Sequence, residues 1–244
     1  MKTRRNLTCC LAIMVLALIF AGCKKPENPS NGGDDNGGGT NLVEDTIPYV
    51  DLGLPSGTLW ATYNVGATTP EDYGNYFAWG ETTIKGVYNS STYKYSKKDG
   101  EWYYLTKYCS KAEAGYDGFT DTLTILEACD DAATANWGAN WHTPTAEDWR
   151  EMVSNTTSTW TEQKGVVGRR FTASNGNSIF LPAAGSCYEN WVNYDGSHGN
   201  YWSSSLITSN PGTANGFIIG LASAYLDING RANGYSVRPV RPSL

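Results

Sequence analysis

The sequence predicts an α+β fold built mainly from short antiparallel strands. Many short apolar or aromatic runs are separated by Gly, Pro and Asn turns, which is typical of strands joined by tight connections. Only two stretches, residues 130–137 and 145–154, have the pattern of short helices. Because helices and strands do not alternate regularly along the chain, an α+β arrangement is favoured over an alternating α/β one.

Both helices carry clear end signals. Gly138 follows the first helix and suits the left-handed conformation that closes a helix. Thr145 can accept hydrogen bonds from the first amides of the second helix, and Asp148 completes a capping-box spacing. The second helix is also expected to have one apolar face, made by Trp149, Met152 and Val153.

The first half of the domain is expected to contain few strands. Residues 49–53 and 58–61 predict a hairpin around the Pro/Gly turn at 54–57. An aromatic strand is predicted at residues 73–80. Residues 81–120 are polar and tyrosine-rich with little periodicity, and we interpret them as loops.

The second half is predicted to be β-structure. The turn Asn175-Gly176-Asn177 indicates a hairpin between residues 170–173 and 178–182. Residues 186–200 are expected to form a long loop. The remaining strands are predicted at 201–204, 217–222 and 235–240.

The N-terminal segment has the layout of a secretory signal. Residues 1–22 combine a basic start with an apolar run that is too short to span a membrane. The tetrapeptide that ends in Cys23, Phe-Ala-Gly-Cys, resembles the lipobox of bacterial lipoproteins, in which that cysteine is acylated. Residues 23–48 are then expected to form a disordered Gly/Asn/Asp tether, and residues 49–244 a single domain.

The mature chain is expected to be acidic. The full sequence has 18 Lys and Arg against 24 Asp and Glu. Removing residues 1–22 takes away three basic residues and no acidic one, which leaves 15 against 24 and a net charge of −9. A nucleic-acid partner would need a basic face, so we expect none. Membrane attachment is expected only through the lipid anchor.

Three cysteines remain once the signal segment and Cys23 are set aside: Cys109, Cys129 and Cys187. An odd number in an exported protein leaves two alternatives. One is a disulfide, with Cys109–Cys129 as the favoured pairing, beside a single thiol. The other is three unpaired buried cysteines, because a domain of this size can build a core without disulfides.

Several segments, in order along the chain, resemble the Fibrobacter succinogenes major paralogous domain of exported bacterial proteins. They are residues 50–61, 79–81, 130–133, 137–138, 141–145, 179–185, 201–205 and 236–240. The resemblance covers about residues 49–242. It implies a C-type-lectin-like fold, related to the branch that contains the formylglycine-generating enzymes. His142 stands where that family usually has Arg, which removes any charge pair made by that residue.

The sequence gives little support for an enzyme. The formylglycine-generating enzymes use a close pair of cysteines that bind copper, and no such pair occurs here. His142 and His198 are too few for a three-His zinc site. A serine elbow, a P-loop and a dinucleotide-binding glycine pattern are also missing from the sequence. We therefore expect no catalytic residues, with a formylglycine-generating-enzyme-like catalyst as a remote alternative.

Calcium-dependent sugar binding is a further idea that the lectin resemblance raises. Residues 188–195 offer oxygen ligands of the kind that calcium takes. The Glu-Pro-Asn and Trp-Asn-Asp motifs of sugar-binding C-type lectins are missing. Asn and Asp in such loops commonly make turns with their own backbone. We expect no cofactor.

The C-terminal third resembles the variable region of diversified C-type-lectin-like proteins, in which this region forms the ligand face. The resemblance places residues between the Trp-Ser-Ser strand and the last strand on that face, although Trp202 is more simply a core residue. Stacking from aromatic side chains and hydrogen bonds from polar ones would hold the ligand. The predicted ligand-binding residues are Trp191, Tyr194, Asp195, Tyr225, Asp227, Asn229 and Arg231.

The combined expectation is a lipid-anchored, exported binding module at the outer membrane or cell surface of a Gram-negative bacterium. It would recognise a glycan or a protein without catalysis. The alternative is a structural or adhesive subunit of a cell-surface assembly, which would be distinguished by co-purification with partner subunits.

Overall fold

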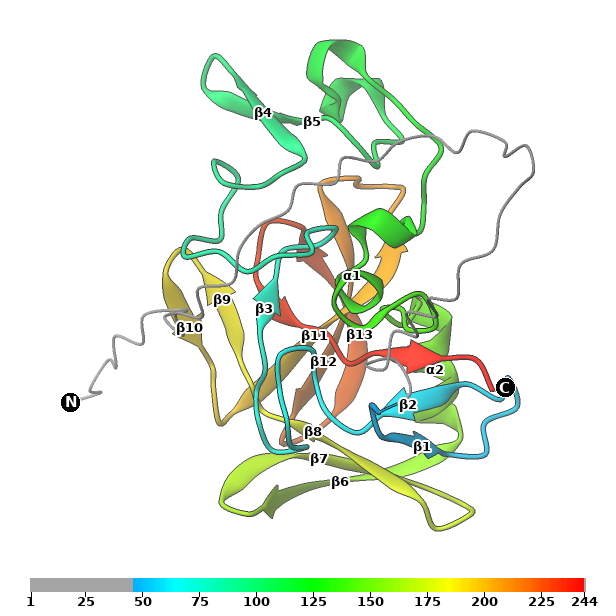
Figure 1. Cartoon of the computed structure of the whole chain (residues 1–244). Helices are drawn as coiled ribbons and strands as arrows, with labels where there is room; N and C mark the ends of the chain where they lie inside the picture. The colour runs from blue at the N-terminus through cyan, green and yellow to red at the C-terminus, as the bar shows by residue number, and fades with distance from the viewer. Residues whose placement is uncertain (1–45, 244) are drawn as a thin grey trace, which may run out of the picture.

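A computed structural model describes residues 46–243 (Figure 1). The predicted signal peptide, Cys23 and nearly all of the predicted tether lie outside the described residues. The first strand begins at Tyr49, where the sequence predicts that the domain starts. Within residues 46–243, no helix is both long and apolar enough to span a bilayer.

The centre of the domain is a five-stranded mixed sheet in the order β13-β12-β11-β14-β3 (Figure 1). Neighbouring strands are antiparallel except β11 and β14, which are parallel, with Tyr201 opposite Ser236. Its strands are β3 (Tyr76–Phe77), β11 (His198–Leu206), β12 (Thr213–Gly220), β13 (Ala224–Gly230) and β14 (Tyr235–Ser236).

Smaller sheets and hairpins surround this central sheet. One three-stranded sheet has the order β1-β2-β15 and another β6-β7-β8, while β4-β5 and β9-β10 are separate hairpins. Their strands are β1 (Tyr49–Asp51), β2 (Leu59–Ala61), β4 (Ser96–Asp99), β5 (Trp102–Leu105), β6 (Thr156–Gln163), β7 (Val166–Ala173), β8 (Ser178–Pro182), β9 (Ser186–Tyr188), β10 (Trp191–Asn193) and β15 (Val240–Arg241). The sheet-rich α+β class is therefore confirmed.

The two α-helices of the described part are α1 (Ala132–Trp137) and α2 (Ala146–Ser154), as predicted. Asp131 caps α1 by accepting hydrogen bonds from the amides of Ala133 and Thr134, and Gly138 ends it with a φ of 99°. Thr145 and Asp148 form the predicted capping box of α2. Three short 3₁₀ turns precede α1: Ala112–Ala114, Tyr116–Gly118 and Ala128–Asp130.

Replacing Thr145 by alanine is expected to lower the free energy of unfolding by about 1 kcal/mol, the usual cost of losing an N-cap side chain. The Thr145 hydroxyl accepts from the Asp148 amide at 3.1 Å, and alanine leaves that amide without its partner. Thr145→Ser keeps the hydroxyl and should change the free energy by only a few tenths of a kcal/mol. Urea unfolding of both variants measures this, and equal stability of the two would contradict the role of the cap.

The core has two clusters, one on each side of the central sheet. In the first, Trp149 of α2 stacks on Phe217 with ring centroids 4.3 Å apart and contacts Trp60 at 4.7 Å. In the second, Trp202 stacks on Tyr235 at 4.3 Å. Trp202 is therefore a core residue. The buried apolar face of α2 is made by Ala146, Trp149 and Met152, whereas Val153, which was predicted to belong to it, is exposed.

Several strand predictions were wrong. Residues 81–120, interpreted as loops, contain the β4-β5 hairpin, and residues 186–200 contain β9-β10 and the start of β11. The predicted aromatic strand at 73–80 is reduced to the two residues of β3. The predicted final strand is broken into β14 and β15, and Pro239, which has no amide hydrogen, lies in the break.

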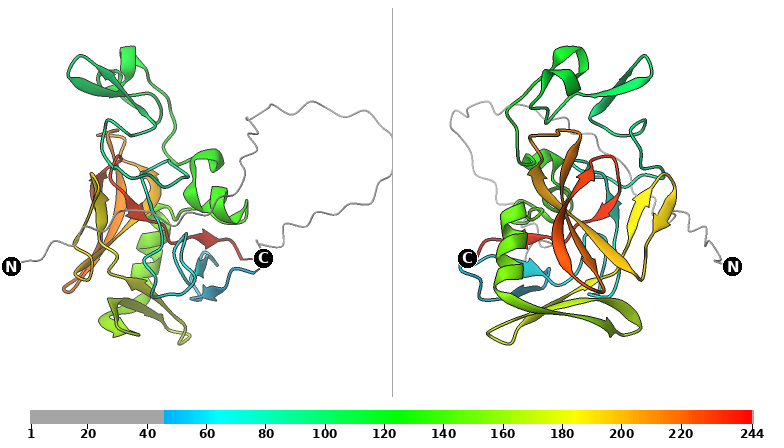
Figure 2. Two further views of the ribbon diagram at one scale, coloured as in Figure 1. Left: turned by 60° about the vertical axis from the view of Figure 1, so that its left-hand side comes forward. Right: turned by 180° about the vertical axis from the view of Figure 1, so that it is seen from behind.

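The β4-β5 hairpin stands at one end of the molecule and the β6-β7-β8 sheet at the other, as both views in Figure 2 show. The first and last strands both pair with β2, which brings residues near Tyr49 and Arg241 into one small sheet. The hairpin and the turns beneath it line a groove.

Candidate functional site

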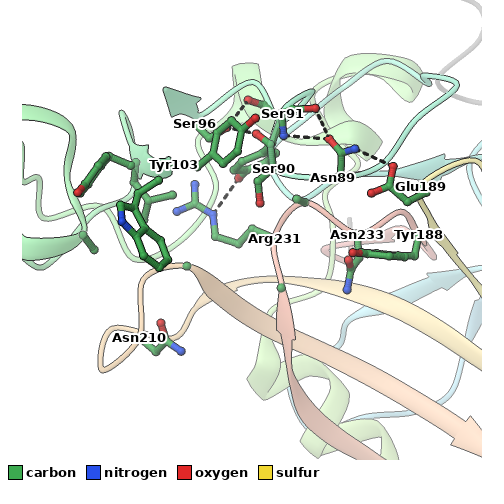
Figure 3. A pocket seen from close by; sticks show the side chains of 18 of the residues that line it. Asn89, Ser90, Ser91, Ser96, Tyr103, Tyr188, Glu189, Asn210, Arg231 and Asn233 are labelled. Carbon is green, nitrogen blue, oxygen red and sulfur yellow. Dashed lines mark hydrogen bonds between the residues drawn. The ribbon is translucent and has the colours of Figure 1, made fainter. Parts of the chain in front are cut away.

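A groove of about 890 Å³ lies between the β4-β5 hairpin and three turns of the central region (Figure 3). The hairpin supplies one wall, and the β9-β10, β11-β12 and β13-β14 turns supply much of the rest. Residues 89–93, which precede β4, and Glu113 and Ala114 of the first 3₁₀ turn complete the lining. Segments that are about 140 residues apart in the chain therefore meet here, which no local sequence pattern reveals. The lining combines aromatic rings with amide, hydroxyl and carboxylate groups.

The hairpin wall is aromatic. β4 and β5 are joined by a two-residue loop, and Gly100 within it has a φ of 59°, a conformation that glycine adopts without strain. The hairpin places Trp102 and Tyr103 at the groove with 71% and 40% of their surface exposed. Large aromatic side chains this exposed are available to stack on a ligand.

The hairpin is held to the domain by ion pairs at its base. Lys94 and Lys107 flank it in the sequence, and both bind Asp130, whose oxygens lie 3.0 and 2.5 Å from the two ammonium nitrogens. Tyr108 also donates to Asp130, at 2.8 Å. Burial alone would raise the pKa of the Asp130 carboxyl, but these hydrogen bonds outweigh it and hold that pKa well below its ordinary value.

The opposite wall comes from the β9-β10 turn. Tyr188 lines the groove and is 55% exposed. Glu189 has a φ of 53°, which is unusual for a residue with a side chain, and its backbone is held by two hydrogen bonds with Tyr88 of 2.8 and 2.9 Å. Its carboxylate accepts from the Asn89 amide at 2.7 Å, as Figure 3 shows. A strained backbone position at the edge of a groove is typical of functional sites.

Arg231 forms the floor of the groove and is only 1% exposed. Its Nε donates to the Tyr93 hydroxyl at 2.8 Å (Figure 3), and Nη1 donates to the carbonyls of Tyr108 and Pro211. Its Nη2 donates to the Lys107 carbonyl at 3.0 Å. The guanidinium also lies over the Trp79 ring at 4.7 Å. Arg231 thus joins the hairpin segment to the C-terminal strands.

The prediction that Arg231 acts at the surface was wrong, because every donor nitrogen of its side chain is used inside the protein. Asp227 accepts from the backbone amide of Ile228 at 2.8 Å, on the edge strand of the central sheet. Asn229 accepts from the Tyr235 hydroxyl at 2.6 Å. Hydrogen bonds within the protein thus explain both residues without a ligand.

The predicted ligand-binding residues are not all brought together. Trp191 pairs across the hairpin with Tyr188, so it flanks the groove on the same face. Tyr225 lines a second cavity of about 450 Å³, together with His198. Tyr194 packs edge-on against that histidine, with ring centroids 5.6 Å apart. Asp195 is exposed in the loop before β11.

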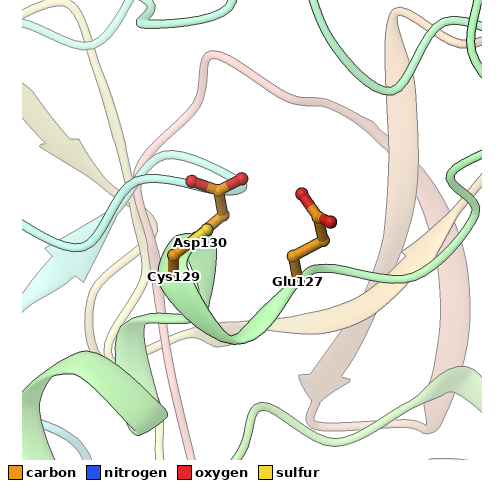
Figure 4. A group of neighbouring side chains, drawn as sticks. All are labelled: Glu127, Cys129 and Asp130. Atoms are coloured by element: carbon orange, nitrogen blue, oxygen red, sulfur yellow. The ribbon is translucent and has the colours of Figure 1, made fainter. Parts of the chain in front are cut away.

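A cluster of three potential metal ligands, Glu127, Cys129 and Asp130, lies beside α1 (Figure 4). Their ligand atoms fall within 4.8 Å of one another. Lys107 already bridges Glu127 and Asp130, so this cluster is explained by the ion pairs at the base of the hairpin. It lies apart from residues 188–195, where the sequence suggested calcium ligands.

The Cys109–Cys129 disulfide is not formed, and both residues carry free thiols. Cys109 is buried in the core, and its sulfur donates to the Lys111 carbonyl at 3.1 Å, whereas Cys129 is exposed in a 3₁₀ turn. Cys187 is buried beneath the β9-β10 hairpin.

Comparison of this chain with protein-family models, with curated proteins and with solved structures found no match.

Proposed function

We propose that this protein is an exported, lipid-anchored binding module of a Gram-negative cell envelope, and that the groove under the β4-β5 hairpin is its ligand site. The observation that carries the proposal is the groove itself. Exposed aromatic rings on two separate elements, Trp102 with Tyr103 and Tyr188, face a lining of amides and hydroxyls. A concave site with aromatic walls and a few polar groups is the usual form of a binding site.

A glycan is the ligand that this chemistry suits best. A sugar ring has an apolar face of C–H groups that can lie on an aromatic ring, and a rim of hydroxyls that both donate and accept hydrogen bonds. Asn210 and Asn233 line the groove, and a side-chain amide can pair with such hydroxyls in both directions. A peptide segment of a protein ligand could use the same groups and is the second ligand class.

We further propose a C-type-lectin-like fold for the domain. Three features support it: the first and last strands share one small sheet, a capped helix packs on the central sheet, and one long excursion, residues 78–197, separates the central strands β3 and β11. Binding rather than catalysis is proposed because the buried charged groups nearest the groove, Arg231 and Asp130, hold the hairpin in place.

The alternative of a structural or adhesive subunit is supported by a different surface. Leu221 and Ile228 are 74% and 58% exposed at and beside the edge strand β13, and Tyr225 is 49% exposed between them. Exposed apolar side chains on a sheet edge can contact another protein.

The Trp102→Ala variant is expected to bind at least about tenfold more weakly to whichever glycan the intact domain recognises, since tenfold corresponds to about 1.4 kcal/mol of lost stacking. A glycan array followed by calorimetry on residues 45–244, with and without calcium, provides the measurement. Trp102→Phe keeps an aromatic ring and should lose much less affinity.

The matched control is the double variant Tyr225→Ala/Asp227→Ala, which alters the surface that the sequence suggested. If this variant loses binding while Trp102→Ala binds fully, the ligand site lies on β13 and not in the groove. If the intact domain binds no glycan on the array and co-purifies with partner subunits, the structural alternative is favoured.

A further inference from the structure

We infer that the groove selects uncharged glycan chains and rejects chains of uronic acids, with Glu113 and Glu189 as the residues that set this specificity. The inference rests on the proposed function, because it takes the groove to be the glycan site. It goes further by assigning a ligand class and two residues to that site.

The charged groups of the groove lining are the carboxylates of Glu113 and Glu189 and the buried guanidinium of Arg231. Neither glutamate forms an ion pair with a lysine or arginine of residues 46–243. The Glu189 carboxylate accepts a hydrogen bond from the neutral amide of Asn89. These two carboxylates, which come from separate elements, therefore act on any charge that enters the groove.

Among the described residues, Arg231 is the only basic residue of that lining, and it is 1% exposed. Four of its five N–H groups donate to the Tyr93 hydroxyl and to three backbone carbonyls. Its positive charge therefore lies beneath the surface of the groove and out of contact with a ligand carboxylate, whereas Glu113 is exposed. Lys98 lies nearby, over the Tyr103 ring at 5.9 Å, but it is outside the lining.

A uronic acid chain carries a carboxylate on every ring, so placing it in the groove would bring like charges together while the one cation of the lining stays buried. Unit charges separated by several ångströms at a partly solvated surface repel by on the order of 1 kcal/mol. A neutral chain of the same length has the same stacking faces and hydroxyls and avoids this repulsion. The groove should therefore bind it several-fold more tightly.

The test uses purified residues 45–244 and hexasaccharides of glucose, mannose, galactose and xylose, with galacturonic and glucuronic acid hexasaccharides as charged counterparts. Affinities are measured by calorimetry at low and high salt. At least one neutral hexasaccharide is expected to bind, and its uronic acid counterpart should bind at least about fivefold more weakly at low salt. Raising the salt should narrow this difference, because salt screens exposed charges.

The double variant Glu113→Gln/Glu189→Gln isolates the cause. Glutamine keeps the size of the side chain, so the affinity for neutral hexasaccharides should persist. The ratio of the affinities for neutral and uronic acid hexasaccharides should fall to about twofold or less. Glu147→Gln, an exposed change on α2 away from the groove, should leave the discrimination intact.

The inference is overturned if a uronic acid chain binds as tightly as its neutral counterpart, if the glutamine variant keeps the full discrimination, or if none of the hexasaccharides binds. These failures are separable from failure of the proposed function. Trp102→Ala would still weaken the binding of a uronic acid chain or a protein if the groove is the site but the ligand class is wrong. If Trp102→Ala leaves binding to every recognised ligand unchanged, both proposals fall.

Discussion

Replacing Arg231 by methionine is expected to lower the free energy of unfolding by at least about 3 kcal/mol. Methionine has a similar length but no donors, so the Tyr93 hydroxyl, the buried carbonyls of Tyr108 and Pro211 and the partly buried carbonyl of Lys107 lose their partner together. Unsatisfied buried acceptors cost about 1–3 kcal/mol each. Urea unfolding followed by tryptophan fluorescence measures the change.

Arg231→Lys should recover only part of the loss, because an ammonium lacks the planar fork that reaches four acceptors at once. Arg150 provides the control, since it is an exposed arginine on α2 that pairs only with Glu147. Arg150→Met should change the free energy of unfolding by less than about 0.5 kcal/mol. Equal effects at the two arginines would show that the buried network contributes little to stability.

Raising the pH above about 10 is expected to unfold the domain cooperatively. Burial raises the pKa of the Tyr93, Tyr108 and Tyr201 hydroxyls well above the ordinary value, and raises that of Tyr235 to about 12. Each folded-state pKa therefore lies above its unfolded value. The stabilisation from these groups is fully present below pH about 10 and is lost as the pH rises through the folded-state values.

Tyrosinate absorbance and circular dichroism recorded over the same pH series provide the measurement. The buried tyrosines should ionise only as the circular dichroism signal is lost. A single ionisation of all 16 tyrosines with no change of structure would contradict the burial of this group.

The parts of the fold that could be predicted are those that short-range chemistry determines. The capping box of Thr145 and Asp148, the closing Gly138 and the Asn175-Gly176 hairpin each depend on residues within a few positions of one another. Their geometry needs no information from the rest of the chain. The same holds for the first hairpin, whose Gly57 amide donates to the Leu54 carbonyl at 2.9 Å.

The β4-β5 hairpin was missed although a local signal exists. Asp99-Gly100 is a turn pair, and an aromatic run begins at Trp102. The charged residues around the turn hide any apolar alternation, because the outer part of this hairpin buries little and is held through its base. For this hairpin, a turn pair beside an aromatic run is thus a better sign than hydrophobic periodicity.

The groove itself could not be predicted from the sequence. Its floor depends on Arg231 meeting carbonyls of residues 107, 108 and 211, and its far wall depends on Glu189 pairing with Tyr88. The position of Arg231 beside a turn suggested that its side chain is exposed. It is buried because segments distant in the sequence cover it. The resemblance to diversified C-type-lectin-like proteins pointed to the C-terminal strands. Of these strands, the groove contains mainly the turn that joins β13 to β14.

β1, with which the described strands begin, pairs with β2 near the end of the molecule opposite the β4-β5 hairpin (Figure 1). If the protein is attached through its N-terminal side, as we propose, the groove under that hairpin would stay uncovered. Neighbouring copies on one surface would then offer their grooves to the same long polymer. Weak individual contacts would combine into avidity, so a modest affinity in each groove would be enough to retain the polymer at the cell.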